Sequence, residues 1–181
     1  MKEMNSLPPL LAAQDWPAAE RLLRRLAKGK APPPAVFYNL AKVLEAAGKP
    51  SQVKHWLERA VLADPRYGLA WFELGRIALA RFELETAKAA FQQAAGLMPT
   101  DTDARRNLGR VALRLGDWVT AADCFAGQTD KEAQLARYRI AAETGADSRA
   151  LRDALLAQRD WRPDTLKALT RTAKGSIPLS F

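Results

Sequence analysis

Few residues in this sequence could carry out acid–base, nucleophilic or metal chemistry. The chain has one histidine, His55, and one cysteine, Cys124, whereas imidazole and thiolate metal sites need several such ligands. Nucleophilic catalysis would require the thiol and the imidazole to meet. We expect His55 to lie on a helix surface or in a helix contact, and Cys124 to be a small buried side chain. No glycine-rich string that cradles phosphate occurs. The sequence therefore predicts a non-enzymatic protein with no catalytic residue, cofactor or metal.

Three basic residues point to another kind of chemistry, the binding of carboxylates. Lys42, Arg76 and Arg110 follow one another at intervals of 34 residues, and the aromatic residues Tyr38 and Phe72 are the same distance apart. An Arg guanidinium can hold a carboxylate with two hydrogen bonds, and an aromatic ring beside it offers apolar contact area. These side chains can act together only if the fold brings residues at this interval to equivalent positions on one surface.

Apolar and small residues repeat at the same interval. Self-comparison aligns four columns, which are Trp16, Pro50, Leu84 and Trp118; Ala19, Val53, Ala87 and Ala121; Leu23, Leu57, Phe91 and Phe125; and Leu40, Leu74 and Leu108. Ala41, Gly75 and Gly109 directly follow the last column, while Pro65 and Pro99 close two of the units. Proline cannot continue a helix, and a small residue lets two helices approach closely. The columns thus predict units that are each a pair of antiparallel helices.

The best-matched unit resembles the tetratricopeptide-repeat family. The family pattern W-x2-L-G-x2-Y, A-x3-F, P is matched by Trp71, Leu74, Gly75, Ala87, Phe91 and Pro99, with Ala78 in place of the aromatic residue. The resemblance implies an all-α fold, a right-handed superhelical solenoid of antiparallel helix pairs. We expect about four to five repeats, with degenerate terminal ones and a C-terminal capping helix.

These patterns predict a single repeat domain over residues 1–174, followed by a tail at 175–181. The expected units are about 1–33, 34–67, 68–101, 102–130 and 131–162, with a cap at 163–173. Shortening the fourth unit by five residues places Gly145 in register with the earlier units. Pro8 and Pro9 are expected to limit the first helix to about residues 10–14. In the cap, we expect Leu166, Leu169 and Thr170 to cover the last unit.

In the family that this sequence resembles, the first helices of successive units line a surface that binds peptides or partner helices. The positions expected to face this groove, and so to bind a partner, are Tyr38, Asn39, Lys42, Phe72, Glu73, Arg76, Arg106, Asn107, Arg110 and Arg114. They suit an acidic or carboxylate-bearing segment with a hydrophobic side chain. The alternative is an ordinary solvated face, with Glu73 neutralising Arg76 and with Tyr38 and Phe72 packed into neighbouring helices.

The groove positions resemble the carboxylate clamp of chaperone-binding members of the family without matching it. Glu73 stands where the clamp has Asn, and Asp103 and Asn107 stand where it has Lys and Arg. We therefore expect an adaptor or scaffold for protein partners, not a receptor for chaperone tails.

Two alternative functions stay open. The formal net charge is +8 and its excess lies toward the two ends, which would suit RNA or an anionic surface bound through the basic terminal units. Aromatic residues that could stack on bases are not interleaved with the basic ones, so nucleic acid is the less favoured partner. The chain would also fit an N-terminal interaction domain of a longer enzyme.

The location and self-association of the chain are also expectations from sequence. No apolar run is long enough to span a membrane. The single cysteine and the proline-interrupted N-terminal segment are typical of a cytoplasmic protein. The apolar residues 177–181 offer a second route to partners, because this tail could dock into a groove of its own chain or of a second copy.

Overall fold

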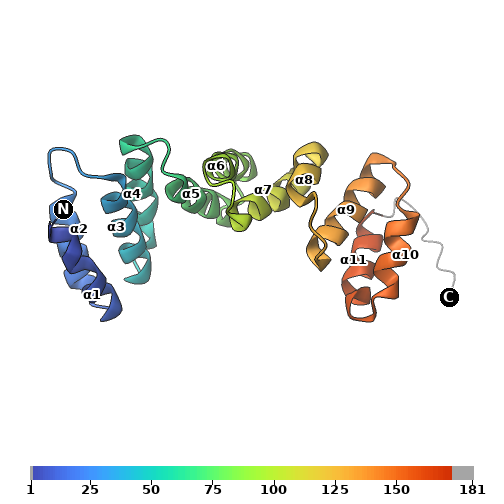
Figure 1. The fold of residues 1–181 in the computed structure, drawn as a ribbon, viewed down its shortest axis with the longest axis horizontal. Helices are drawn as coiled ribbons and strands as arrows, with labels where there is room; N and C mark the ends of the chain where they lie inside the picture. Colours follow the sequence, from blue (N-terminus) through green and yellow to red (C-terminus); the bar gives the residue numbers. More distant parts are fainter. Residues whose placement is uncertain (1, 173–181) are drawn as a thin grey trace. The chain divides into compact units, whose positions relative to one another are not determined.

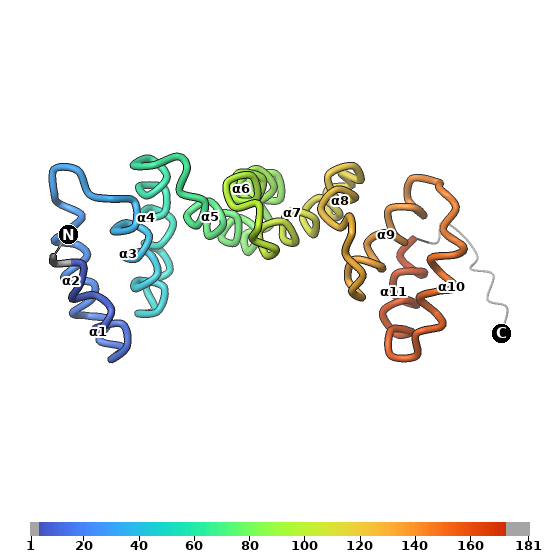
Figure 2. Tube along the Cα trace, in the orientation of Figure 1, coloured from blue at the N-terminus to red at the C-terminus, as the bar shows by residue number. Residues whose placement is uncertain are grey.

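The computed structural model describes residues 2–172, and all regular structure in this range is helical (Figures 1 and 2). Short 3-10 helices span Lys2–Ser6 and Arg159–Trp161. The α-helices are α1 Leu7–Ala12, α2 Trp16–Leu26, α3 Pro34–Ala46, α4 Pro50–Ala63, α5 Gly68–Ala80, α6 Leu84–Leu97, α7 Thr102–Leu115, α8 Trp118–Phe125, α9 Lys131–Thr144, α10 Arg149–Ala157 and α11 Arg162–Thr172. The expectation of an all-α fold is confirmed, and α2, α4, α6 and α8 each begin at a member of the first repeat column.

The chain divides into two compact units, Met1–Arg105 and Arg106–Phe181. The boundary falls inside α7, where the sequence carries no change of composition. Each unit has its own buried clusters and is described by itself below. The single domain expected over residues 1–174 stays a prediction.

The first unit is built from helix pairs whose seams are filled by the repeat columns. Within this unit, α1 packs on α2, α3 on α4 and α5 on α6. Leu23, Leu57 and Phe91 are fully buried. A Cβ atom built on Gly75 would lie 2.8 Å from ring atoms of Phe91, so the absence of a side chain lets α5 approach α6. The small residue after the leucine column therefore has the role that the sequence predicted.

The turns between the helices of a pair repeat at the same interval. Gln14, Gly48, Phe82 and Gly116 have φ angles of 54°, 71°, 59° and 74°. Directly after each of them, a backbone N–H reaches back across the turn; Glu83 N, for example, donates to the Ala78 carbonyl at 3.0 Å. This bond is typical of a helix ending in a left-handed residue, which is usually glycine. Two of the four turns thus hold a side chain where glycine would be relaxed.

Replacing Phe82 with glycine should raise the free energy of unfolding by about 1 kcal/mol, because a left-handed conformation costs a residue with a Cβ atom roughly that much. The side chain is 82% exposed, so little packing is lost. Urea denaturation followed by circular dichroism measures the change. Ala89→Gly, on the exposed face of α6, is the control and should be destabilising by about 1 kcal/mol. A destabilised Phe82→Gly variant would contradict the strain.

In the second unit, α8 packs on α9, and α9, α10 and α11 pack on one another. Gly109 of α7 repeats the close approach seen at Gly75, since a Cβ atom there would lie 2.8 Å from Phe125 and 2.9 Å from Cys124. The helix α9 ends at Gly145, whose φ is 77°, as the shortened register predicts.

Two details differ from the expectations. The helix α1 begins at Leu7 with Pro8 and Pro9 in its first turn, because proline is tolerated where backbone N–H groups have no helical partner. In α11, Leu169 is buried as expected, but Leu166 is 45% exposed and Thr165 is fully buried in its place. The Thr165 hydroxyl donates to the Trp161 carbonyl at 2.9 Å, which satisfies its polar group. Thr170 is exposed and does not cover the unit.

Candidate functional site

The residues with catalytic potential take structural positions. His55 is exposed on α4, and its ring meets that of Trp56 edge-on at 5.2 Å. Cys124 is buried, as the sequence predicts. Over residues 2–172, no group of three or more His, Cys, Asp or Glu side chains could hold a metal ion. In the same range, no helix is both long enough and apolar enough to cross a membrane.

The predicted groove positions of the first unit form an ion-pair network across α3 and α5. Lys42 lies 3.0 Å from Glu73, and Arg76 lies 2.8 Å from Glu73 and 2.9 Å from Glu45. Glu45 also pairs with Lys42, one turn before it on α3. Two cations thus share two carboxylates, and the face has no unpaired positive charge.

Burial and charge pairing act in opposite directions in this network. Glu73 is only 9% exposed, and a buried carboxylate needs partners. The hydrogen bond from Lys42 holds the pKa of Glu45 below its usual value, although partial burial opposes this. For Lys42, burial alone would lower the pKa, but the hydrogen bonds to Glu45 and Glu73 outweigh it and raise the pKa. The geometry is therefore that of a neutralised face.

The aromatic positions of the same face contact other parts of the first unit. Tyr38 meets Tyr67 edge-on with ring centroids 5.6 Å apart, and Phe72 meets Phe91 in the same way at 5.7 Å. Both side chains are half-buried, as is Asn39 beside Tyr38. The rings therefore pack within the unit and leave only part of their surface for a partner.

The predicted positions of α7 in the second unit are engaged in the same manner. Arg110 holds Glu132 with two hydrogen bonds of 2.6 and 2.7 Å. Arg106 lies 2.8 Å from Asp130 and also donates to Gln128. The amide oxygen of Asn107 accepts a bond of 3.5 Å from Arg110, and Arg114 is exposed.

A groove that sequence reasoning did not identify lies in the second unit between α7, α9 and α11. Its volume is about 440 Å³. Its apolar lining comes from Leu113, Leu135 and Ala168, and its basic lining includes Arg139 of α9 and Arg171 of α11. The size and the mixture of apolar surface with a few polar groups are those of a ligand-binding cleft.

Arg139 is the one polar group of this groove that is buried without a partner. Its Nε atom is buried, and in the described part of the chain it has no hydrogen-bond partner. The guanidinium lies 5.6 Å from the Trp118 ring centroid. Burial and, to a smaller degree, the positive charge of Arg171 lower the pKa of Arg139, while Glu143 opposes this. Two neighbouring cations without an ion-paired carboxylate favour an anionic ligand.

The arrangement of paired helices has counterparts among solved structures. A tetratricopeptide repeat protein from Parabacteroides merdae ATCC 43184 superposes with a TM-score of 0.69 at 16% identity, covering 94% of this chain and 75% of that one. Two crystal structures of MamA superpose with TM-scores of 0.65 and 0.62 at 20% and 18% identity; they cover 98% and 91% of this chain, and 96% and 90% of theirs. The chain has the tetratricopeptide-repeat fold. No family model and no curated protein sequence matches it.

In a tetratricopeptide-repeat solenoid, α7 and α9 are first helices of successive units, so the α7–α9–α11 groove lies on the face that the sequence singled out. One signal could have identified it. With the fourth unit shortened by five residues, Arg139 falls in the column of Lys42, Arg76 and Arg110. The signal that those three cations are paired was weaker, because their partners Glu45 and Glu132 lie outside the columns.

Proposed function

We propose that the chain is a non-enzymatic adaptor that binds a segment of a partner protein in the α7–α9–α11 groove. The observation that carries the proposal is the buried Arg139 Nε atom, which has no hydrogen-bond partner among the described residues. A buried donor without a partner costs free energy that a ligand can recover. The preferred segment carries a carboxylate for Arg139 and Arg171, and an apolar side chain for Leu113 and Leu135.

The earlier cations of the column have a secondary place in this proposal. A carboxylate that reaches Lys42 or Arg76 must displace Glu45 or Glu73, and one that reaches Arg110 must displace Glu132. Each exchange replaces one ion pair with another and brings little net gain. We therefore expect Arg76→Glu and Arg110→Glu to weaken partner binding less than a charge reversal at Arg139.

Reversal of Arg139 to glutamate should weaken binding of an acidic peptide by roughly tenfold or more, which is about 1.4 kcal/mol. The probe is a fluorescein-labelled Gly-Glu-Leu-Glu-Leu peptide, and fluorescence anisotropy gives Kd. A matching peptide with glutamine in place of glutamate should bind the original chain more weakly. The control is Arg137→Glu, an equal charge change at an exposed position of α9, with an expected effect below about twofold.

Two results would contradict the proposal. Equal losses for Arg137→Glu and Arg139→Glu would mean general attraction to a basic surface, and equal Kd values for the two peptides would mean that no carboxylate is recognised. Circular dichroism of each variant should match that of the original chain, because Arg139 and Arg137 take no part in an ion pair within the described residues.

A further inference from the structure

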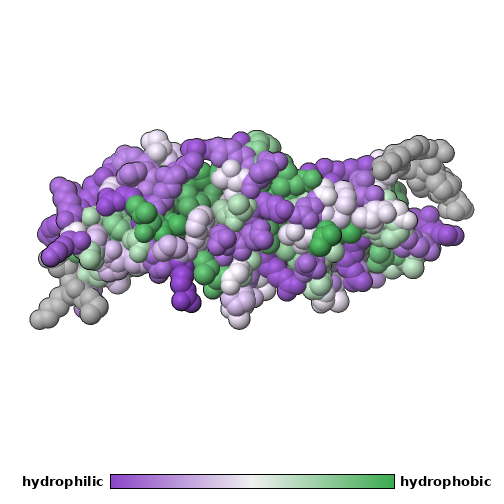
Figure 3. All heavy atoms as spheres, turned by 90° about the horizontal axis from the view of Figure 1, so that it is seen from above, coloured by the Kyte–Doolittle hydropathy of each residue, from purple (hydrophilic) through white to green (hydrophobic). Residues whose placement is uncertain are grey.

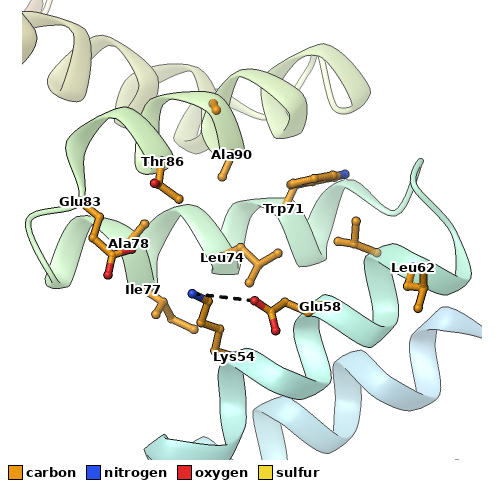
Figure 4. A pocket seen from close by; sticks show the side chains of 12 residues that line it. Lys54, Glu58, Leu62, Trp71, Leu74, Ile77, Ala78, Glu83, Thr86 and Ala90 are labelled. Carbon is orange, nitrogen blue, oxygen red and sulfur yellow. Dashed lines mark ion pairs between the residues drawn. The ribbon is translucent and has the colours of Figure 1, made fainter.

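A second groove, in the first unit, lies between α4, α5 and α6 (Figure 4). Its volume is about 430 Å³, and Trp71, Leu74 and Ile77 of α5 line it. Because an α-helix turns once in 3.6 residues, these residues lie on the side of α5 opposite to Glu73 and Arg76. The space-filling view in Figure 3 shows hydrophobic surface over the part of the chain that contains α4 to α6.

The preceding repeat interval shows what such a groove can hold, because there the corresponding space is filled by the chain itself. Trp56 of α4 stacks on Phe37 of α3 with ring centroids 6.2 Å apart. Two guanidinium groups cover the rings: Arg24 lies 5.6 Å from the centroid of Trp56, and Arg59 lies 5.1 Å from Trp56 and 4.5 Å from Phe37. An indole with arginines on its faces is a strong cation–π arrangement.

One interval of 34 residues later, the filling groups are missing. Trp71 occupies the Phe37 column, but Ala90 stands in the column of Trp56, and Glu58 stands in the column of Arg24. Both Ala90 and Glu58 line the groove. The volume of an indole is therefore open above Trp71, and the cation that would cover it is replaced by a carboxylate.

The bridges that close the earlier interval are also missing. There, Lys49 of α4 pairs with Glu20 of α2 at 2.7 Å. The corresponding residues of the open groove are Glu83 and Lys54, but Lys54 pairs with Glu58 on its own helix at 3.8 Å, as the dashed line in Figure 4 shows. Within the described residues, no cation lies within ion-pair distance of Glu83. The rim thus carries two carboxylates and one lysine.

The rim also presents apolar surface to solvent. Leu62 lines the groove and is 83% exposed. A large exposed apolar patch with a polar rim is typical of an interaction site. Trp and Arg are the residues that most often dominate binding energy at protein interfaces, so a partner can supply both groups that the groove lacks.

We propose that the α4–α5–α6 groove binds a helical segment of a partner protein in which a Trp is followed three residues later by an Arg, the spacing of Trp56 and Arg59. The indole stacks on Trp71 above Ala90. The guanidinium, together with any further basic residue of the segment, meets Glu58 and Glu83. This site is separate from the α7–α9–α11 groove and prefers the opposite charge, so failure of one proposal leaves the other intact.

The test uses an acetylated and amidated, fluorescein-labelled peptide with Trp and Arg at this spacing on an alanine and glutamine background. Fluorescence anisotropy should show roughly tenfold weaker binding of two companion peptides, one with Ala for Trp and one with Glu for Arg. Ala90→Trp, which restores the filled interval, should weaken binding of the Trp and Arg peptide by a similar factor. Ala46→Trp, at an exposed position of α3 outside the groove, is the matched control and should leave Kd unchanged.

A charge exchange keeps the proposal testable if Ala90→Trp disturbs folding. The double variant Glu58→Lys and Glu83→Lys alters only exposed positions. It should lose affinity for the Trp and Arg peptide and gain affinity for the companion with Glu. Unchanged preference in this variant, or equal Kd values for all three peptides, would overturn the proposal.

Two other occupants would also overturn it. An unlabelled peptide of residues 173–181 that displaces the probe would assign the groove to this chain's own C-terminal segment. Sedimentation of the original chain as a dimer, with Ala90→Trp sedimenting as a monomer, would assign it to a second copy. The proposal expects no displacement and the same sedimentation for both proteins.

Discussion

Replacing Gly75 with leucine will lower the free energy of unfolding by about 3 kcal/mol, the upper range for overpacking a close helix contact. The reason is the distance of 2.8 Å between a Cβ atom at this position and two ring atoms of Phe91. Phe91 is fully buried and cannot move without displacing its neighbours. Because leucine has a higher helix propensity than glycine, by about 1 kcal/mol, the steric cost itself is larger than the measured loss.

The matched control for this substitution is Gly96→Leu on α6. Gly96 is also helical, but no atom lies within 4 Å of a Cβ atom built there. That variant gains the helix propensity without the contact and should be more stable by up to about 1 kcal/mol. Urea denaturation of both variants gives the comparison. Equal stability of the two would mean that the α5–α6 seam is not closely packed at Gly75.

The largest loss is expected for Phe125→Ala in the second unit, about 3–5 kcal/mol. Phe125 is fully buried and forms a cluster with Ala133 and Ala136 of α9, against which Leu113 packs. Removal of the ring leaves a cavity among helices that cannot collapse, because Gly109 already brings α7 against this side chain. The hole and the lost burial add to one another.

Hydrogen exchange is the suitable measurement, because it reports on each unit separately. Phe125→Ala should lower the protection of α8 and α9 amides. Val119→Ala, on the exposed side of the same helix, removes apolar atoms from solvent and should change stability by less than about 0.5 kcal/mol. Comparable losses in the two variants would show that burial does not determine the contribution of this column.

The helix pairs could be predicted from the sequence because their causes are local and recur. A proline that closes a unit, a small residue in a seam and an apolar column each restrict the chain in the same way at every interval. Gly75 and Phe91 are the clearest example, since their types alone imply the contact. The exposed Leu166 shows the limit: α11 has no following unit, so periodicity could not determine which of its neighbours, Leu166 or Thr165, would be buried.

The binding surfaces were less predictable because charge pairing depends on residues outside the columns. The spacing of Lys42 and Arg76 identified one face, but Glu45 lies one turn away on α3 and reaches Arg76 only after α3 and α5 pack. The α4–α5–α6 groove depends on what is missing from a column, the indole at Ala90. A search for regularity does not detect such an exception until the filled interval is seen in three dimensions.

The chain's single cysteine lies where α7 and α8 are closest. A Cβ atom at Gly109 would be 2.9 Å from Cys124, and the thiol is buried. A reagent can reach a buried sulfur only while the surrounding helices are apart, so its labelling rate measures how often this seam opens. The molecule thus carries a built-in kinetic probe of breathing at one defined joint, without any foreign label.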